Sequence, residues 1–189
     1  MSIENSRTPE QCERQRDLSN ICLLAGSGNP NLARNLLQEL SQRNSGTPFP
    51  YSMDGASLFN SGEVRTKLPR NLALGIEGKD VLVFQSFGSD KQSPDVHLQE
   101  VEGFSNIARE RGAKSVHLIT PSEPYGRQDK WFSLGETATG LHVARRLISL
   151  FHTVTSVDFH ATKILEEFGD RWTNIHGTTA LLNNPLMRR

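Results

Sequence analysis

The sequence predicts an α/β domain built around a three-layer, mainly parallel β-sheet. Two observations lead to this fold class. Short apolar runs rich in Val, Ile and Leu alternate along the chain with amphipathic segments long enough to form helices. Strands of a parallel sheet read as continuous apolar runs because both of their faces are buried, and right-handed helical crossovers connect them. Helices are therefore expected on both faces of the sheet.

Four apolar runs have the length and composition of buried strands. Each is followed by polar or turn-forming residues, as expected where a strand reaches the edge of a sheet. The predicted strands are Ile21–Ala25, Val81–Gln85, Ser115–Thr120 and Val154–Phe159.

The first predicted helix follows the turn Gly26–Asn29. The Asn29 side chain is suited to cap this helix, and Pro30 suits its first position. Four leucines then recur at helical spacing, at Leu32, Leu36, Leu37 and Leu40. Apolar residues at similar intervals predict further helices over Pro94–Arg111, Thr139–Phe151 and Ala161–Phe168.

Composition excludes several classes of function. The chain has 189 residues, the size of one ordinary domain. Its 21 Lys and Arg residues balance its 21 Asp and Glu residues, so no overall field attracts nucleic acid or an anionic membrane surface. The two cysteines, Cys12 and Cys22, have no metal-ligand spacing and do not make a disulfide framework. A reduced, cytoplasmic setting follows from this cysteine usage.

The opening stretch Met1–Asn20 is polar and lacks the apolar region of a signal peptide. No run of about 18 apolar residues occurs, as a membrane span would require. We therefore expect a mobile extension over residues 1–20, one domain over residues 21–189, and a soluble protein that is not exported.

The segment Pro121–Glu136 (PSEPYGRQDKWFSLGE) is the strongest candidate for ligand binding. It follows a predicted strand, and ligands of parallel α/β sheets bind beyond the carboxyl ends of the strands. The planar guanidinium of Arg127 can form paired hydrogen bonds with phosphate oxygens. Lys130 can supply a flexible positive charge, and the amide of Gln128 can form hydrogen bonds with the edge of a base. A solvated loop with ordinary ion pairs has the same composition, so both interpretations stand at this point.

Asp158 and His160 flank Phe159 at the end of the fourth predicted strand. Alternation along a strand places both side chains on one side of the chain. A carboxylate beside an imidazole suits a divalent metal bound together with phosphates, or an acid/base pair. A hydrogen-bonded His–Asp pair without a ligand explains the same residues. The histidines form no zinc-site pattern, which sets zinc enzymes aside.

The segment Phe59–Glu63 (FNSGE) places an aromatic ring beside hydrogen-bonding groups. An adenine would stack on Phe59 and donate its amino group to an acceptor such as Glu63. A hairpin turn with Phe59 in the core is an equal alternative. The turn Gly26–Gly28 lacks the full glycine patterns of nucleotide-binding loops, so we interpret it mainly as a tight turn.

Taken in order, these segments resemble the amino-terminal half of the ribose-phosphate pyrophosphokinase family. The Arg-Gln-Asp-Lys loop and the Asp-x-His-Ala signature are strong in combination, and the other segments add weight by occurring in the same order. The matching segments are LLAGSGNPNLA (23–33), LFNSGEV (58–64), GKDVLVFQS (78–86), YGRQDKWF (125–132) and VDFHATKILEEF (157–168).

The resemblance implies a phosphoribosyltransferase-like domain that binds Mg2+ and ATP. In the family, the positions matching Phe59 and Glu63 hold adenine from a neighbouring subunit, and those matching Arg127 and Gln128 hold ATP. The position matching His160 serves the Mg2+ and phosphate site. Asp158 supports the same strand end, and Lys130 adds a cation to the ATP loop.

The resemblance also implies ATP and ribose 5-phosphate as substrates, and a homo-oligomer or association with complete synthetase subunits. Three positions depart from the family pattern. Ser61 stands where Asp or Asn is usual, which either weakens the adenine contact or shifts it to Asn60. Lys163 replaces a neutral polar residue, and Trp131 occupies a position that is more often basic.

The family binds ribose 5-phosphate through an acidic pair and a Thr-Gly-Gly-Thr-like loop in its carboxyl-terminal half. Residues 1–189 contain neither an Asp-Asp nor a Gly-Gly pair, so we expect only the ATP-binding half here. Two alternatives follow from this difference. One is a non-catalytic, regulatory homologue that binds nucleotide and oligomerises, and the other is a split product completed by a second chain.

Overall fold

The computed structural model describes residues 18–44, 50–88 and 91–178. Within these ranges the main sheet has six strands, all parallel, in the order β2-β1-β5-β6-β7-β8. The predicted α/β class with a mainly parallel sheet is confirmed. The strands are β1 (Ile21–Ala25), β2 (Tyr51–Ser52), β5 (Asp80–Phe84), β6 (Ser115–Thr120), β7 (Thr153–Val157) and β8 (Trp172–Ile175).

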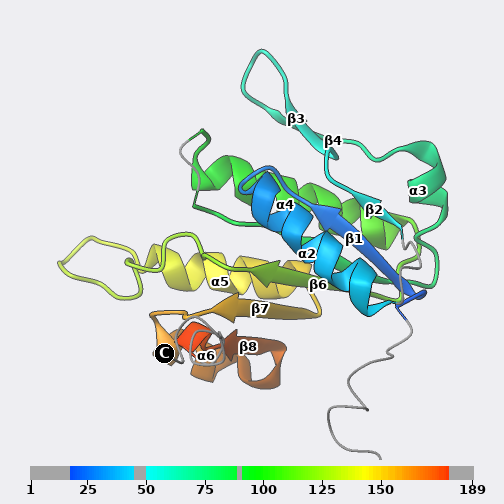
Figure 1. The fold of residues 1–189 in the computed structure, drawn as a ribbon. Helices are drawn as coiled ribbons and strands as arrows, with labels where there is room; N and C mark the ends of the chain where they lie inside the picture. Colours follow the sequence, from blue (N-terminus) through cyan, green and yellow to red (C-terminus); the bar gives the residue numbers. More distant parts are fainter. Residues whose placement is uncertain (1–17, 45–49, 89–90, 179–189) are drawn as a thin grey trace, which may run out of the picture.

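Helices lie on both faces of this sheet (Figure 1). One face carries α2, whose Ala33 packs with Leu23 and Phe84 of the sheet. The opposite face carries α4, α5 and α6 over the larger part of the core. The helices are α2 (Pro30–Arg43), α3 (Arg70–Leu74), α4 (Pro94–Glu110), α5 (Thr139–Leu150) and α6 (Thr162–Phe168), the last followed by the 3-10 turn η1 (Gly169–Arg171).

The two longest helices begin at side-chain caps. The Asn29 side chain accepts a hydrogen bond from the Leu32 amide at 3.0 Å, and Pro30 occupies the first turn of α2, as predicted. At the start of α4, the Ser93 hydroxyl accepts a bond from the Val96 amide at 3.4 Å. These caps fix where each helix leaves the carboxyl edge of the sheet.

The two faces of the sheet are covered unequally. In β6 and β7 alternate residues are buried, and the residues between them are only half-buried. The buried residues Val116, Leu118 and Val154 contact the α4 and α5 side, whereas Ile119 lies on the α2 side. The three-layer arrangement is therefore complete over β1 and β5, whereas over β6 and β7 the face on the α2 side is only partly covered.

A two-stranded antiparallel hairpin projects from the body of the domain (Figure 1). It consists of β3 (Ala56–Leu58) and β4 (Val64–Thr66). Its base packs on α4, where Gly103 approaches Thr66 so closely that a Cβ would lie 2.1 Å from the threonine hydroxyl. The hairpin tip carries Phe59 and Glu63.

The predicted strand boundaries hold for β1 and β6 and shift for the others. β5 ends at Phe84 rather than Gln85, and β7 ends at Val157 rather than Phe159. β2 and β8 were not predicted because they have only two and four residues. In the described part of the chain the sheet thus has six strands, whereas the sequence predicts four.

The predicted extension over residues 1–20 lies mostly outside the described residues. Its last three residues contact the domain: the Leu18 amide donates to the Asn44 side chain, Lys79 Nζ donates to the Ser19 carbonyl at 2.9 Å, and the Asp80 amide donates to the Asn20 carbonyl at 3.0 Å. In β1, Cys22 is fully buried, and this burial raises the pKa of its thiol to about 11. The thiol is therefore neutral at ordinary pH.

Candidate functional site

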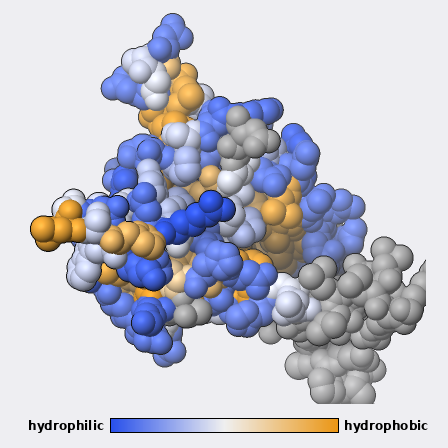
Figure 2. All heavy atoms as spheres, turned by 90° about the vertical axis from the view of Figure 1, so that its left-hand side faces the viewer, coloured by the Kyte–Doolittle hydropathy of each residue, from blue (hydrophilic) through white to orange (hydrophobic). Residues whose placement is uncertain are grey.

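The loops that follow β1, β5, β6 and β7 meet at the carboxyl edge of the sheet. Because these strands are consecutive neighbours and parallel, their carboxyl ends lie in one row. The loop after β6 projects furthest from this edge (Figure 1). Figure 2 faces the same edge and shows apolar surface among hydrophilic groups at the projecting loop.

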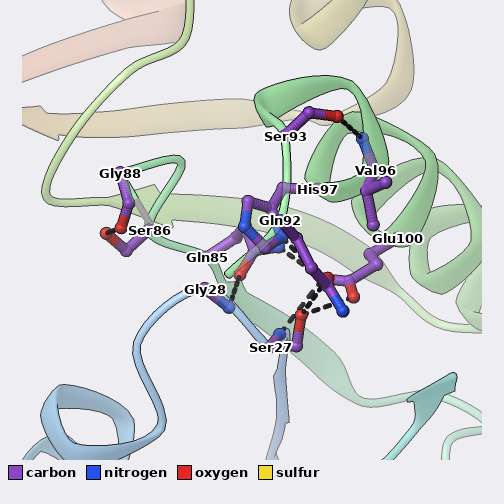
Figure 3. A network of polar contacts seen from close by, with 10 residues as sticks. All are labelled: Ser27, Gly28, Gln85, Ser86, Gly88, Gln92, Ser93, Val96, His97 and Glu100. Carbon is purple, nitrogen blue, oxygen red and sulfur yellow. Dashed lines mark hydrogen bonds and ion pairs between the residues drawn. The ribbon is translucent and has the colours of Figure 1, made fainter. Parts of the chain in front are cut away.

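A buried carboxylate closes the turn after β1 (Figure 3). Glu100 of α4 accepts hydrogen bonds from the Ser27 hydroxyl at 2.6 Å, from the Ser27 amide at 3.1 Å and from Gln85 Nε2 at 2.5 Å. His97 Nδ1 lies 3.3 Å from the same carboxylate, and no hydrogen-bond partner for His97 Nε2 occurs among the described residues. The Gly28 amide donates to Gln85 Oε1 at 3.1 Å.

The glycines of this turn permit its close contact with β5. A Cβ on Gly26 would lie 2.4 Å from the Gln85 side chain, and one on Gly28 would lie 1.8 Å from the Ser86 carbonyl. The amides of Ser27 and Gly28 already have partners inside the protein. The turn is therefore a packing element, as the sequence indicates, and its donors are not free for a phosphate.

Ser122 joins the loops that follow β5 and β6. Its hydroxyl lies 3.1 Å from the Ser86 hydroxyl and accepts a bond from the Gly88 amide at 3.0 Å. Its carbonyl accepts a bond from the Thr120 hydroxyl at 2.7 Å. These bonds fix the start of the loop that carries Arg127.

Two further contacts hold the middle of this loop. Tyr125, with a φ of 59°, donates its hydroxyl to Asp95 of α4 at 2.8 Å, and this bond raises the pKa of Tyr125. The Gln128 carbonyl accepts a bond from the Gly140 amide at the start of α5 at 2.9 Å. Gly140 is needed there, because a Cβ would lie 2.6 Å from the Tyr125 carbonyl.

The predicted ligand-binding side chains of this loop face solvent. Arg127, Gln128 and Lys130 are exposed, with Lys130 Nζ 5.5 Å from the centre of the Phe132 ring. Beyond them lies an exposed apolar tip formed by Trp131, Phe132 and Leu134. The anchored part of the loop thus presents a cation and an amide at the edge of the sheet.

The segment after β7 differs from the predicted geometry of Asp158 and His160. The strand has ended, and Asp158 has a φ of 49°, so strand alternation does not place the two side chains on one face. The Asp158 carboxylate accepts the Gly177 amide at 3.2 and 3.3 Å and lies 3.7 Å from His176 Nδ1. Asp158 therefore points toward the end of β8, and His160 is exposed beside it in the chain.

Glu123 is a feature of the site that sequence reasoning missed. This half-buried residue belongs to the loop after β6 and lines a small hollow together with Phe159, which follows β7. Burial raises the pKa of the Glu123 carboxyl, whereas its own main-chain N–H, the N–H of His160 and the positive charge of His160 act in the opposite direction. Nothing in the sequence marks this contact, because the two residues are joined only by the pairing of β6 with β7.

The adenine-binding candidates lie in the hairpin, away from the Arg127 loop (Figure 1). Phe59 is 51% exposed, which excludes the alternative that its ring belongs to the core. The Arg65 guanidinium lies 5.8 Å from the centre of that ring, and the Ser61 hydroxyl donates to Glu63 at 2.7 Å. Asn60 shares a surface hollow with these residues. One chain alone does not bring Phe59 and Glu63 to Arg127.

Glu63 also lines a groove of about 620 Å3 between the hairpin and α4. Carboxylates from Asp95 and Glu102 line the same groove, whereas Arg127 and His160 do not. In the part of the chain that the structure describes, no three His, Cys, Asp or Glu side chains come together as a metal-ligand group. The described helices include none that is long and apolar enough to cross a membrane.

Comparisons with known proteins point to one family. A family model described as the N-terminal domain of ribose phosphate pyrophosphokinase matches residues 21–150. The chain is 26% identical to ribose-phosphate pyrophosphokinase from Marinomonas sp. over 169 residues, which are 88% of this chain and 49% of that protein. It is also 26% identical over 168 residues to ribose-phosphate pyrophosphokinase 4 from Saccharomyces cerevisiae, covering 88% and 48%.

Among solved structures, the domain resembles phosphoribosylpyrophosphate synthetase from Mycobacterium smegmatis. The TM-score is 0.72 at 26% identity, and the match covers 86% of this chain and 50% of that chain. The chain spans about half the length of the curated relatives it matches.

Proposed function

The chain belongs to the family of the amino-terminal domain of ribose phosphate pyrophosphokinase, and from this premise we propose that it binds Mg-ATP for the synthesis of phosphoribosyl pyrophosphate. The reaction transfers the diphosphoryl group of ATP to the anomeric hydroxyl of ribose 5-phosphate and releases AMP. This chain contributes the ATP-binding half of the site.

The observation that carries the proposal is the convergence of two loops on neighbouring strands. Arg127 follows β6 and His160 follows β7, and these strands pair in parallel register. Ser122 anchors the first loop to the end of β5, and Glu123 of the same loop lines a small hollow with Phe159, which precedes His160. A cation and an imidazole thus stand at one edge of the sheet, where α/β folds bind phosphates.

Each exposed side chain has a role in this proposal. The Arg127 fork holds phosphate oxygens through paired, charge-assisted hydrogen bonds, and Lys130 adds a second positive charge. Gln128 has both a donor and an acceptor for a base or sugar edge. As the β-phosphorus moves from the α-phosphate oxygen to the anomeric oxygen of the sugar, Arg127 stabilises the charge on the transferring oxygens.

The residues that would hold a Mg2+ ion in this proposal are Asp158 and His160, both exposed after the end of β7. Mg2+ is usually held in nucleotide sites by one or two protein carboxylates together with phosphates. Asp158 uses its carboxylate toward the Gly177 amide and still has free lone pairs. When bound, the ion neutralises phosphate charge, while His160 orients the same phosphates.

The separation of the hairpin from the Arg127 loop supports a homo-oligomer. Phe59, Asn60 and Glu63 complete an adenine pocket only if a second subunit brings its hairpin to the first subunit's Arg127 and Gln128. Glu63 then accepts the adenine amino group while Phe59 stacks on the base. Cytoplasmic location is part of the same proposal, since the substrates are products of central metabolism.

The direct test is nucleotide binding by Arg127→Ala, measured by isothermal titration calorimetry with Mg-ATP. Losing the guanidinium is expected to weaken binding by about 1.5–3 kcal/mol, the range for a hydrogen bond to a charged group. Arg70→Ala, an exposed change on α3, is the matched control and should bind as the parent does. An Arg127→Ala variant with parental affinity would show that the loop is only solvated surface.

The shared pocket is tested by mixing two defective variants. Phe59→Ala and Arg127→Ala each damage every site of a homo-oligomer. If the pocket joins two subunits, a mixed oligomer of the two variants contains some sites with both residues intact, so mixing restores part of the tight nucleotide binding. A mixture that binds no better than its separate components contradicts the shared pocket.

The exposed tip formed by Trp131, Phe132 and Leu134 favours one second candidate, a non-catalytic homologue that binds nucleotide and associates with complete synthetase subunits. Clustered exposed apolar side chains mark protein contacts. Co-purification with a complete synthetase, lost on Trp131→Ser with Phe132→Ser, supports this candidate, and unchanged association of the variant contradicts it.

A further inference from the structure

Arg127 lies in a tight turn that begins at Tyr125. The Gln128 main-chain N–H donates to the Tyr125 carbonyl at 2.9 Å, which closes a four-residue turn with Gly126 and Arg127 at its centre. The Gly140 amide, which donates to the Gln128 carbonyl at 2.9 Å, fixes the far end of this turn. The direction in which the Arg127 side chain leaves the domain therefore depends on how Tyr125 is held.

Tyr125 has a main-chain conformation that its residue type disfavours. Its φ of 59° lies in the left-handed region, where a bulky side chain is uncommon. Pro124 precedes it, and in type II turns a proline is likewise followed by a residue with positive φ, usually Gly or Asn. The main chain alone would favour a small residue here, so the contacts of the tyrosine side chain must compensate for the strain.

The Tyr125 side chain joins this turn to the start of α4. Its half-buried ring packs against the core beneath α4 and α5, and its hydroxyl donates to Asp95 Oδ1 at 2.8 Å. Asp95 lies in the first turn of α4, where the helix dipole stabilises a carboxylate. The Ser93 hydroxyl caps the same helix end by accepting a bond from the Val96 amide. The Arg127 turn is thus tied to a well-fixed point of the domain.

We propose that Tyr125 is a positioning residue that holds the Arg127 turn in its nucleotide-binding orientation through the hydrogen bond to Asp95, without touching the nucleotide itself. This inference rests on the proposed function, because it assigns Tyr125 to the same site. Without the bond, the turn keeps its attachment to Gly140 at the start of α5 but loses the one to α4. A turn that is held in advance loses less conformational entropy when the nucleotide binds, so the bond contributes to affinity by preorganisation.

The first experiment asks whether this bond holds the turn, and it needs no nucleotide. NMR records the side-chain Nε–H signal of Arg127 and the exchange rate of the Gln128 amide proton in the parent and in single variants. The variants are Tyr125→Phe, Asp95→Ala, Asp95→Asn and the control Tyr51→Phe. Tyr51 is the other tyrosine of the chain and is exposed in β2, so Tyr51→Phe removes a hydroxyl far along the sheet from the Arg127 turn.

Tyr125→Phe keeps the ring and loses only the hydroxyl, so it should shift the Arg127 signal and speed proton exchange at Gln128. Asp95→Ala should have the same effect, because it removes the acceptor of the same bond. Asp95→Asn keeps an acceptor oxygen and should have a smaller effect, and Tyr51→Phe should have none. Parental Arg127 and Gln128 signals in both Tyr125→Phe and Asp95→Ala overturn the inference.

The second experiment separates positioning from direct contact by a double-mutant cycle on Mg-ATP affinity. Tyr125→Phe should weaken binding about three- to tenfold in the parent, as expected for one lost hydrogen bond. In an Arg127→Ala background the same change should have little further effect, because the side chain that Tyr125 positions is gone. Equal losses in both backgrounds, or no loss in the parent, contradict a role exerted through Arg127.

The two experiments fail in distinguishable ways. If the parent does not bind Mg-ATP, the proposed function fails, and the NMR comparison still decides whether the bond to Asp95 holds the turn. If the parent binds Mg-ATP and Tyr125→Phe moves the Arg127 signal without changing the affinity, the proposed function stands and the positioning role fails. Should Asp95→Ala fold poorly in circular dichroism, Tyr125→Phe, which keeps the packed ring, carries both arms.

Discussion

The hydroxyl of Ser27 donates a 2.6 Å hydrogen bond to Glu100, a residue 73 positions later in the chain. The turn after β1 is thus closed by a carboxylate of the protein itself, at the point where the strand order reverses between β1 and β5. Sheets of this class often bind ligands at such a point. Here the donors of the turn are already bonded within the protein, so the next loops along the edge, after β6 and β7, are the better candidates for ligand binding.

Replacing Glu100 is expected to destabilise the domain strongly. Glu100→Ala leaves the buried polar groups of Ser27, Gln85 and His97 without their shared acceptor, at a cost of about 3 kcal/mol. Glu100→Gln keeps the size and one acceptor oxygen and should cost about half as much. Urea unfolding measures the difference. A Glu100→Ala variant as stable as the surface control Glu110→Ala would mean that the network contributes nothing.

Gly28 is predicted to tolerate no side chain. An alanine Cβ would lie 1.8 Å from the Ser86 carbonyl, so the turn or the β5 loop must move. The expected loss is about 3 kcal/mol, at the upper end for overpacking. Gly75→Ala is the control, because its Cβ would meet nothing closer than 3.5 Å. Thermal unfolding that ranks the two variants equally would refute the close approach.

The stability of the domain should fall as the pH decreases past about 6.5, the usual pKa of histidine, partly because of His117. Its Nε2 lies 2.7 Å from the Ser115 hydroxyl, which itself donates to Asp80, and its Nδ1 lies 2.7 Å from the Thr153 hydroxyl. Burial first, and repulsion by His152 second, lower the pKa of His117, with Asp80 acting in the opposite direction.

The sign of this effect follows from proton linkage. Because the native pKa of His117 lies below the unfolded value, the unfolded chain binds the proton more readily, and stability present at neutral pH is lost as the pH falls toward the native pKa. The free energy of unfolding, measured with urea between about pH 7.5 and 5, should have a shallower slope against pH for His117→Gln than for the parent. The exposed control His142→Gln should keep the parental slope, and equal slopes in all three proteins contradict the assignment.

The sequence predicted the central strands well because their apolar runs are long and uninterrupted. β8 was missed because it is a short edge strand in which only Trp172 is buried, so it has no apolar run. Glu123 and Glu100 were missed for a different reason. Each acts on a residue from a distant segment, and composition or spacing within one segment carries no signal of such a contact.

The strand periodicity that placed Asp158 and His160 on one face does not apply, because the strand ends at Val157. A φ of 49° at Asp158 turns the chain, and the Gly177 amide draws the carboxylate toward β8. A residue that leaves extended geometry at a strand end is common at functional sites. The identities of the candidate residues came from local chemistry and from resemblance, whereas their orientation required the tertiary fold.

The 189-residue polypeptide is expected to fold and bind adenine nucleotide but to make no phosphoribosyl pyrophosphate at an enzymatic rate. Its sheet has a complete core, and the exposed side chains of Arg127, Gln128 and Lys130 lie at one edge of the sheet. Residues 1–189 contain no acidic pair with a glycine loop of the kind that holds ribose 5-phosphate in the family.

Catalysis depends on holding the anomeric hydroxyl in line with the β-phosphorus of ATP, and such positioning supplies roughly 7–11 kcal/mol of barrier reduction. Without a second loop to hold the sugar phosphate, that contribution is lost while nucleotide binding is kept. The measurement is AMP and product formation from Mg-ATP and ribose 5-phosphate, with the polypeptide alone and with an added acceptor-binding domain from a complete synthetase. Turnover that appears only in the second mixture supports the prediction. Fast turnover by the polypeptide alone would show that its own residues bind the sugar phosphate.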